Sequence, residues 1–384
     1  MNGQTSEKRR TPAWGRVLLV VVVALLVAGT GMVLIPRDSG TPPAVSFSET
    51  ARVDASNDAA TLIESAQALS AAEGPDAKNA GLDVLVTLLT THARALMAPE
   101  TTTGGPSTTA ATGTAPAAPA TRASLVEQLS ASASKRLAAA READGGIARL
   151  LAAVGTSQLL HAERLAAAWQ LPVRAPVPAT GKQSPDNKAP AATTVPAATV
   201  PATTVPAATP TAAPCPSVSP TPAPSSATTD SALAAAVHAQ QEAVYAYQVA
   251  LKRLADSAAT AATKDLQVHM LLLRQAEALT RANCGDVPAT TAGYQLPQLF
   301  TQDPAAALGA LEASSLPVYG DLVALSTGET RDWAVDGLMA AARRSIARGA
   351  ALPALPGLKL DAGELPSLPT SGPAPAPAAS SNAG

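Results

Sequence analysis

The chain has 384 residues, of which 15% are charged and 2% are aromatic, and its formal net charge is −2. A near-neutral chain without clustered basic and aromatic side chains lacks the surface of a nucleic-acid-binding protein. Alanine inflates the 47% hydrophobic content, and the 34 prolines are concentrated in a few tracts. This mixture favours ordered helical bundles joined by disordered linkers over one large core.

The first predicted element is an apolar segment near the N-terminus. Residues 1–16 carry four basic side chains, and Val17 to Ile35 form a run of 19 residues without a charge. A membrane-spanning helix needs about 20 apolar residues, and its basic flank stays in the cytoplasm. We therefore predict a cytoplasmic tail at 1–16, a single transmembrane helix at 17–35 and an extracytoplasmic location for the rest. A cleaved signal peptide is the alternative, although its apolar region is usually only about 7–15 residues long.

A first helical bundle is predicted at residues 49–171. Four helical patterns occur there, interrupted by a low-complexity insert at 99–121. The third pattern opens with the spacing of a capping box, because Glu127 follows Ser124 by three residues. Four helices suffice for a small antiparallel bundle.

Two histidines of this bundle, His92 and His161, each lie in an HAxxL motif. Histidines without accompanying ligand residues are usually found on helix surfaces, and we expect that here. The alternative is a weakly duplicated hairpin that brings the two rings together.

Residues 172–229 form a linker rich in proline, alanine and threonine, in which VPAAT-like pentapeptides recur at 195, 200 and 205. Proline removes backbone donors and favours extended conformations, so we predict a disordered, semi-rigid spacer. The tail at 351–384 has a similar composition, and we expect it to have no fold of its own.

A second set of four helical patterns occupies residues 230–350. The third begins at Asp303-Pro304, a helix N-cap followed by proline at the first helical position. At 100° per residue, the apolar positions of each helix form one inward seam. Four polar residues lie in these seams or at their edge and are the binding candidates: Gln240, Asp265, His269 and Glu312. His238 and Glu242 fall outside the first seam, and we expect both to be solvated.

These helices carry recognisable stretches, namely AVYAYQVALKRL, VHMLLLRQAEAL with a later YQLP, and DPAAALGALEASSLPVYGDLVAL. In these stretches residues 230–350 resemble a ferritin-like domain of unknown function, DUF4439, of actinobacterial exported proteins. The resemblance implies an all-α chain with a ferritin-like four-helix bundle after the first bundle. The family typically has Glu-His just before its tyrosine-containing stretch, whereas this chain has Gln240-Gln241.

A ferritin-like fold raises the question of a di-iron centre. Such a centre needs inward carboxylates from two helices and Glu-x-x-His on each of the other two. No glutamate of this chain has a histidine three residues later, and Gln240 is neutral. We therefore expect no metal cofactor. A partial site of Asp265, His269 and Glu312 is the remaining metal alternative.

The two cysteines are predicted to pair. Cys215 precedes the first helix of the second bundle and Cys284 follows its second helix, so both fall at one end of an up-down bundle. Disulfides persist outside the cell, and we predict a Cys215–Cys284 bridge. Two free thiols are the alternative.

Together these features predict a membrane-anchored, extracytoplasmic, non-enzymatic binding or interaction module of the cell envelope, with an envelope protein as its expected partner. The alternative is a metal-binding or oxidoreductase ferritin-like protein with a reduced site. A third reading is a structural spacer that holds something away from the membrane.

Overall fold

The computed structural model describes residues 45–73, 80–97, 121–171, 227–360 and 362–368. These residues form helices and connecting segments without a strand, which confirms the all-α prediction. The predicted transmembrane helix at 17–35 lies outside them, as do the insert and nearly all of the linker. None of the described helices is both long and apolar enough to span a membrane.

The first bundle consists of α2 (Phe47–Glu73), α3 (Ala80–Leu96), α4 (Arg122–Glu142) and α5 (Gly145–Ala168). The N-cap of α4 is Thr121, whose hydroxyl accepts from the Ser124 backbone N–H at 3.1 Å. The capping box therefore lies three residues before the predicted one. Every residue from 151 to 162 in α5 is buried, so α5 is the central helix of this part of the fold.

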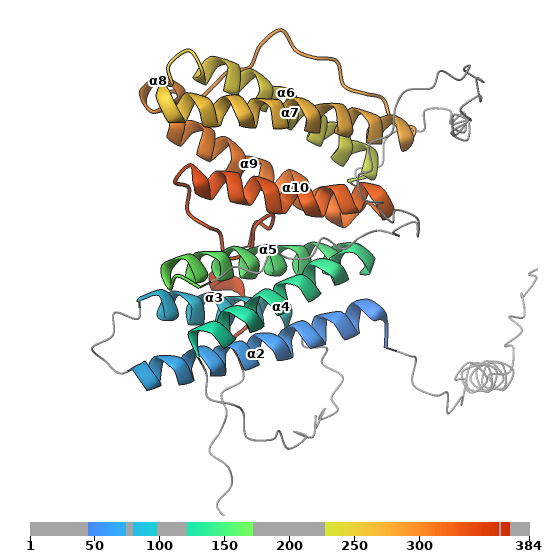
Figure 1. Ribbon diagram of the computed structural model, residues 1–384. Helices are drawn as coiled ribbons and strands as arrows, with labels where there is room; N and C mark the ends of the chain where they lie inside the picture. The colour runs from blue at the N-terminus through green and yellow to red at the C-terminus, as the bar shows by residue number, and fades with distance from the viewer. Residues whose placement is uncertain (1–44, 74–79, 98–120, 172–226, 361, 369–384) are drawn as a thin grey trace, which may run out of the picture. The chain divides into compact units, whose positions relative to one another are not determined.

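The second bundle consists of α6 (Thr229–Ala250), α7 (Asp256–Ala282), the short α8 (Leu299–Gln302), α9 (Pro304–Leu325) and α10 (Gly328–Ala347). In Figure 1, α6 and α7 form one layer and α9 and α10 the next. The predicted start of α9 is confirmed, because the Asp303 carboxylate accepts from the Ala306 backbone N–H at 3.0 Å.

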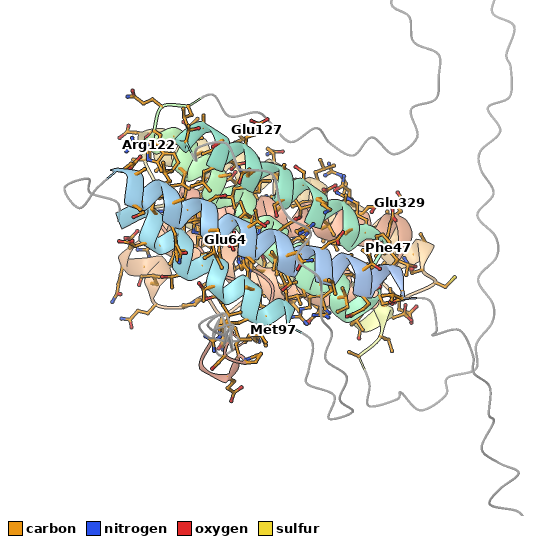
Figure 2. All side chains as sticks on the ribbon, turned by 90° about the horizontal axis from the view of Figure 1, so that it is seen from below. Phe47, Glu64, Met97, Arg122, Glu127 and Glu329 are labelled. Carbon is orange, nitrogen blue, oxygen red and sulfur yellow. The ribbon has the colours of Figure 1, made fainter. Side chains whose placement is uncertain are left out.

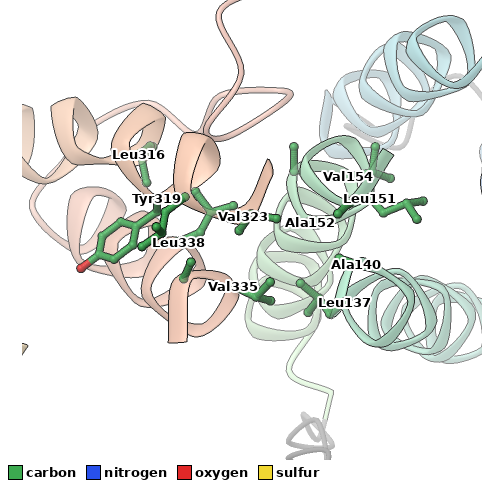
Figure 3. Packing of buried hydrophobic residues seen from close by; sticks show 14 of the residues in the cluster. Leu137, Ala140, Leu151, Ala152, Val154, Leu316, Tyr319, Val323, Val335 and Leu338 are labelled. Carbon is green, nitrogen blue, oxygen red and sulfur yellow. The ribbon is translucent and has the colours of Figure 1, made fainter. Parts of the chain in front are cut away.

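The two bundles are not separate bodies. Figure 3 shows Leu151 and Val154 of α5 in the same apolar cluster as Val323 of α9 and Val335 of α10. The contact is close because a Cβ added at Gly145 would lie 2.2 Å from the backbone oxygen of Ala324.

Ion pairs surround this apolar contact between the bundles. Arg141 pairs with Asp336 at 2.6 Å, and Arg343 pairs with Glu163 at 2.5 Å. The helices on either side of residues 172–226, α5 and α6, thus belong to one packed unit made of both bundles. The sequence does not decide whether the two bundles touch, and the structure shows that α5 and α9 share a core. The spacer predicted at residues 172–229 lies outside the described residues except for 227–229, and it stays a prediction.

The segment after α10 also differs from the prediction of a disordered tail. Leu355 is buried in the shared core. The carbonyl oxygen of Gly357 accepts from Arg149 Nε at 3.0 Å and from Arg149 Nη2 at 2.6 Å. Gly357 has φ +83°, and a Cβ at Gly320 would lie 2.3 Å from the Gly357 oxygen. Residues 349–360, called the clasp below, therefore fasten α9 to α5, while residues 369–384 lie outside the described part.

Candidate functional site

The second bundle contains a buried polar cluster at its centre. Gln240 of α6, His269 of α7 and Glu312 of α9 are each at most 2% exposed. Three of the four predicted binding residues therefore meet, because the seam of each helix faces the same interior.

One oxygen of Glu312 receives all the hydrogen bonds of that carboxylate. Its Oε1 accepts from the Tyr247 hydroxyl at 2.7 Å, from His269 Nε2 at 2.7 Å and from Arg344 Nε at 3.0 Å. Its Oε2 is buried and has no hydrogen-bond partner among the described residues. The carboxylate is thus hydrogen-bonded through Oε1 alone, although both oxygens are buried.

The hydrogen-bond chain continues through Gln240. Its side-chain nitrogen donates to the Tyr319 hydroxyl at 3.0 Å, and its oxygen lies 2.9 Å from His269 Nδ1. Two proton arrangements satisfy this chain: a doubly protonated His269 with this amide orientation, or a neutral ring with the amide turned over and Tyr319 donating. In both arrangements Gln240 occupies its hydrogen-bonding groups with His269 and Tyr319.

The charges in the cluster stabilise ionised Glu312. Burial alone would raise the pKa of Glu312, but the hydrogen bond from His269 and the positive charge of Arg344 outweigh it and lower the pKa to about 2. Burial alone would lower the pKa of Arg344, but the charge of Glu312 and the hydrogen bond to it, together with the nearby tyrosines, raise the pKa. Burial, with a contribution from Glu312, raises the pKa of Tyr247 and of Tyr319, so both phenols keep their protons.

Asp265, the fourth predicted residue, lies outside this network. It forms an ion pair with Arg348, whose guanidinium lies 5.1 Å from the ring centroid of Tyr247. Both ring nitrogens of His269 are hydrogen-bonded to Gln240 and Glu312, so Asp265 does not join His269 and Glu312 in one cluster.

Arg344 of α10 is a residue of the cluster that the sequence analysis does not identify. The inward positions that periodicity assigns to this helix are Val335, Leu338, Ala342 and Ile346, and they offer no ligand. In the structure the side chain of Arg344 is 13% exposed and its head reaches Glu312. Long basic side chains can bury their stems in this way.

The residues present do not fit the di-iron centre that a ferritin-like resemblance implies. Across the described ranges, no three His, Cys, Asp or Glu residues converge as a metal-binding group. The Arg344 guanidinium already supplies the positive charge beside Glu312. Gln240 is neutral and hydrogen-bonded on both sides.

A cavity of about 100 Å³ adjoins the cluster between α6 and α9. It is lined by Ala239, Gln240, Glu242, Ala243, His269, Leu311, Glu312, Ser314, Ser315 and Val318. Glu242, which we expected to be fully solvated, is half-buried at this cavity. The lining thus contains two carboxylates and neither lysine nor arginine.

The histidines of the first bundle are buried, so their predicted surface location is wrong. His92 is 0% exposed and His161 is 9% exposed. His92 Nε2 donates to the Ala354 carbonyl of the clasp at 2.8 Å. Burial lowers the pKa of His92 to about 4, the bond to Ala354 opposes this change, and the charge of nearby His161 adds to it. The alternative of two neighbouring rings is therefore the better description.

The predicted disulfide remains a prediction. Cys284 follows α7 with φ +61°, and Cys215 lies outside the described residues.

Residues 232–360 match the family model described as a domain of unknown function (DUF4439). The match covers α6 to α10 and continues through the clasp, ten residues beyond the predicted end at 350. No match was found among curated proteins or solved structures.

Proposed function

We propose that residues 232–360, which form a DUF4439 domain, act as the ligand-binding part of a membrane-anchored, extracytoplasmic, non-enzymatic module with a ferritin-like bundle. The observation that carries this proposal is the buried, unpartnered Oε2 of Glu312 beside a cavity. A buried acceptor without a partner is costly, so a ligand that donates a hydrogen bond to it gains free energy.

The chemistry of the cavity favours a small protonated amine. Glu242 and Glu312 line it, and Arg344, which is not among the lining residues, donates to Oε1 of Glu312 rather than to Oε2. A volume of about 100 Å³ holds roughly three water molecules, at about 30 Å³ each. Leu311 and Val318 offer apolar wall for a short alkyl group. An envelope protein that presents a lysine side chain would offer the same chemistry.

The protonation states argue for binding rather than catalysis. A general acid or base works best with a pKa near the working pH. Glu312 has a pKa of about 2, and the raised pKa values of Tyr247 and Tyr319 keep their protons in place. None of these groups exchanges a proton readily near neutral pH.

Anchoring and location rest on the sequence. The uncharged run from Val17 to Ile35 and its basic flank support a single-pass anchor with the bundles outside the cell. The Pro/Thr-rich composition of residues 172–226 is consistent with an exported protein.

Nuclear magnetic resonance of the full chain in detergent micelles tests ligand binding directly. The chain has four histidines, so selective ¹³C-histidine labelling gives one signal from the cavity, His269, and three internal controls. Titration with ethylammonium is expected to shift the His269 signal saturably, whereas ethanol is not.

Two tryptophan variants sharpen this test. Ser314→Trp places an indole at the cavity and should abolish the shift. Ala310→Trp lies one turn earlier on the same exposed side of α9, outside the cavity lining, and should preserve it. An equal response to ethanol, or an unchanged shift in Ser314→Trp, would rule out this binding site.

A further inference from the structure

A second concave site lies in the first bundle, outside the residues that match the family. It is a groove of about 290 Å³ between α2 and α4. Its lining residues are Phe47, Thr50, Ala51, Asp54, Lys135, Arg136, Ala138, Ala139 and Glu142. Figure 2 shows the two helices side by side, with Phe47 at the N-terminal end of α2.

The groove contains a buried arginine whose hydrogen-bonding capacity is largely unused. Arg136 is 1% exposed, and its Nη2 donates to Asp58 at 2.9 Å. Its Nε and Nη1 are buried and bonded to nothing in the part of the chain that the structure describes. Unpaired donors on a buried guanidinium are costly, and an anionic oxygen is the acceptor that suits them best.

The other charged residues near Arg136 restrict how much negative charge the bound anion can carry. Lys135 lies 3.5 Å from both Asp54 and Asp58, at the long limit of an ion pair. Asp54 and Glu142 also line the groove and would repel a dianion such as a phosphate monoester. Asp58 adds a third carboxylate beside Lys135 and Arg136, so the case for an anion rests on the unpaired donors of Arg136, and these carboxylates restrict it to a single negative charge, as on a carboxylate.

Between these charged residues the groove also has apolar wall. Phe47 is 51% exposed at its edge, and Ala51, Ala138 and Ala139 contribute methyl groups. Since a water molecule takes about 30 Å³ of liquid, the groove has room for roughly ten non-hydrogen atoms. A carboxylate with an alkyl tail of about eight carbons fills such a space.

We propose that the groove between α2 and α4 binds a monocarboxylate with an apolar tail, whose carboxylate reaches Arg136 and whose tail lies against Phe47 and the alanines. This site is independent of the amine site proposed in the second bundle.

The test is photoaffinity labelling of the full chain in phosphatidylcholine vesicles. The probe is octanoate with a diazirine on its alkyl chain, and adducts are mapped by mass spectrometry. Labelling is expected on peptides of α2 and α4, and a large excess of octanoate should remove most of it by competing for the same site. Octanol should compete far more weakly, because it lacks the charge.

Three variants distinguish labelling in the groove from nonspecific labelling of hydrophobic surface. Arg136→Gln should lower labelling about tenfold by loss of the charge-assisted bond. Ala138→Phe should remove labelling by filling the groove from an exposed position, without disturbing Arg136. The control Ala131→Phe, exposed on the same helix and away from the groove, should label like the unmodified chain.

The proposal is overturned if octanol competes as well as octanoate, if Ala138→Phe labels normally, or if adducts occur only outside α2 and α4. Ala138→Phe also keeps the test decisive if Arg136→Gln fails to fold.

Discussion

Replacing Glu312 by glutamine removes the negative charge from the centre of the second bundle and nearly preserves the size of the side chain. The amide oxygen can still accept from Tyr247 and His269. Arg344, however, loses its counter-ion in a site where its side chain is only 13% exposed. The substitution therefore isolates the electrostatic contribution of the pair.

The expected loss of stability follows from the pKa of Glu312 and from the typical cost of breaking a buried ion pair. The pKa of Glu312 is about 2, against an ordinary value of 4.5. That difference corresponds to about 3 kcal/mol of stability at neutral pH, at about 1.4 kcal/mol per pKa unit. Removing one partner of a buried ion pair typically costs about 3–5 kcal/mol. We expect Glu312→Gln to lower the free energy of unfolding by about 3–5 kcal/mol.

Urea unfolding of the chain from Ser46 onward, followed by circular dichroism at pH 7, measures this loss. Glu277→Gln is the control, because it breaks an exposed pair with Arg281 at 3.4 Å and should cost less than about 0.5 kcal/mol. The folded pKa of Glu312 is depressed, so its contribution is complete above pH 4.5 and is lost as the pH falls toward 2. The difference between variant and parent should shrink over that window. A loss below about 1 kcal/mol at pH 7 would refute the buried-pair account.

Three further outcomes follow from the first bundle and the clasp. The pKa of His92 is depressed from 6.5 to about 4, so between these pH values the unfolded chain binds a proton at His92 that the folded chain does not. The free energy of unfolding should therefore fall by about 3 kcal/mol as the pH falls from 6.5 to 4. The His92→Gln variant should show a flatter pH profile over this range. Gly320→Ala forces a methyl group toward Gly357, at 2.3 Å from its oxygen, and should cost about 1–3 kcal/mol in urea unfolding. Gly146→Ala, which meets nothing within 4 Å, should not destabilise the chain. Residues 227–368 produced alone should self-associate in light scattering, since they expose the core shared with α5; a stable monomer would contradict that shared core.

The centre of the candidate site could be predicted from the sequence because helical periodicity fixes which side chains face inward. Gln240 and Glu312 lie where that periodicity places them, whereas His269, expected at the edge of the inward face of its helix, is 2% exposed. Arg344 could not be predicted, because its position favours the surface and only its long stem reaches the cluster. Asp265, expected in the inward face, is half-buried instead and pairs with Arg348 at the end of α10, and pairing between helices is not set by periodicity.

The packing of the two bundles against each other could not be predicted from the sequence either. Helical periodicity assigns one buried face to each helix, whereas residues 151–162 of α5 are buried on all sides between α4 and α9. The clasp was missed because it was grouped with the Pro/Ala/Ser-rich tail that follows it, although Leu352, Leu355 and Leu358 recur every three residues and pack on the core.

The central claim is that Arg344, rather than a metal ion, supplies the cation beside Glu312. Metal analysis of the purified full chain, after loading with iron, manganese or zinc and removal of excess ions, tests it most directly. The account predicts substoichiometric metal that is the same in the parent chain and in Glu312→Gln. Stoichiometric metal in the parent chain that disappears in Glu312→Gln would contradict the account and favour the metal-binding alternative.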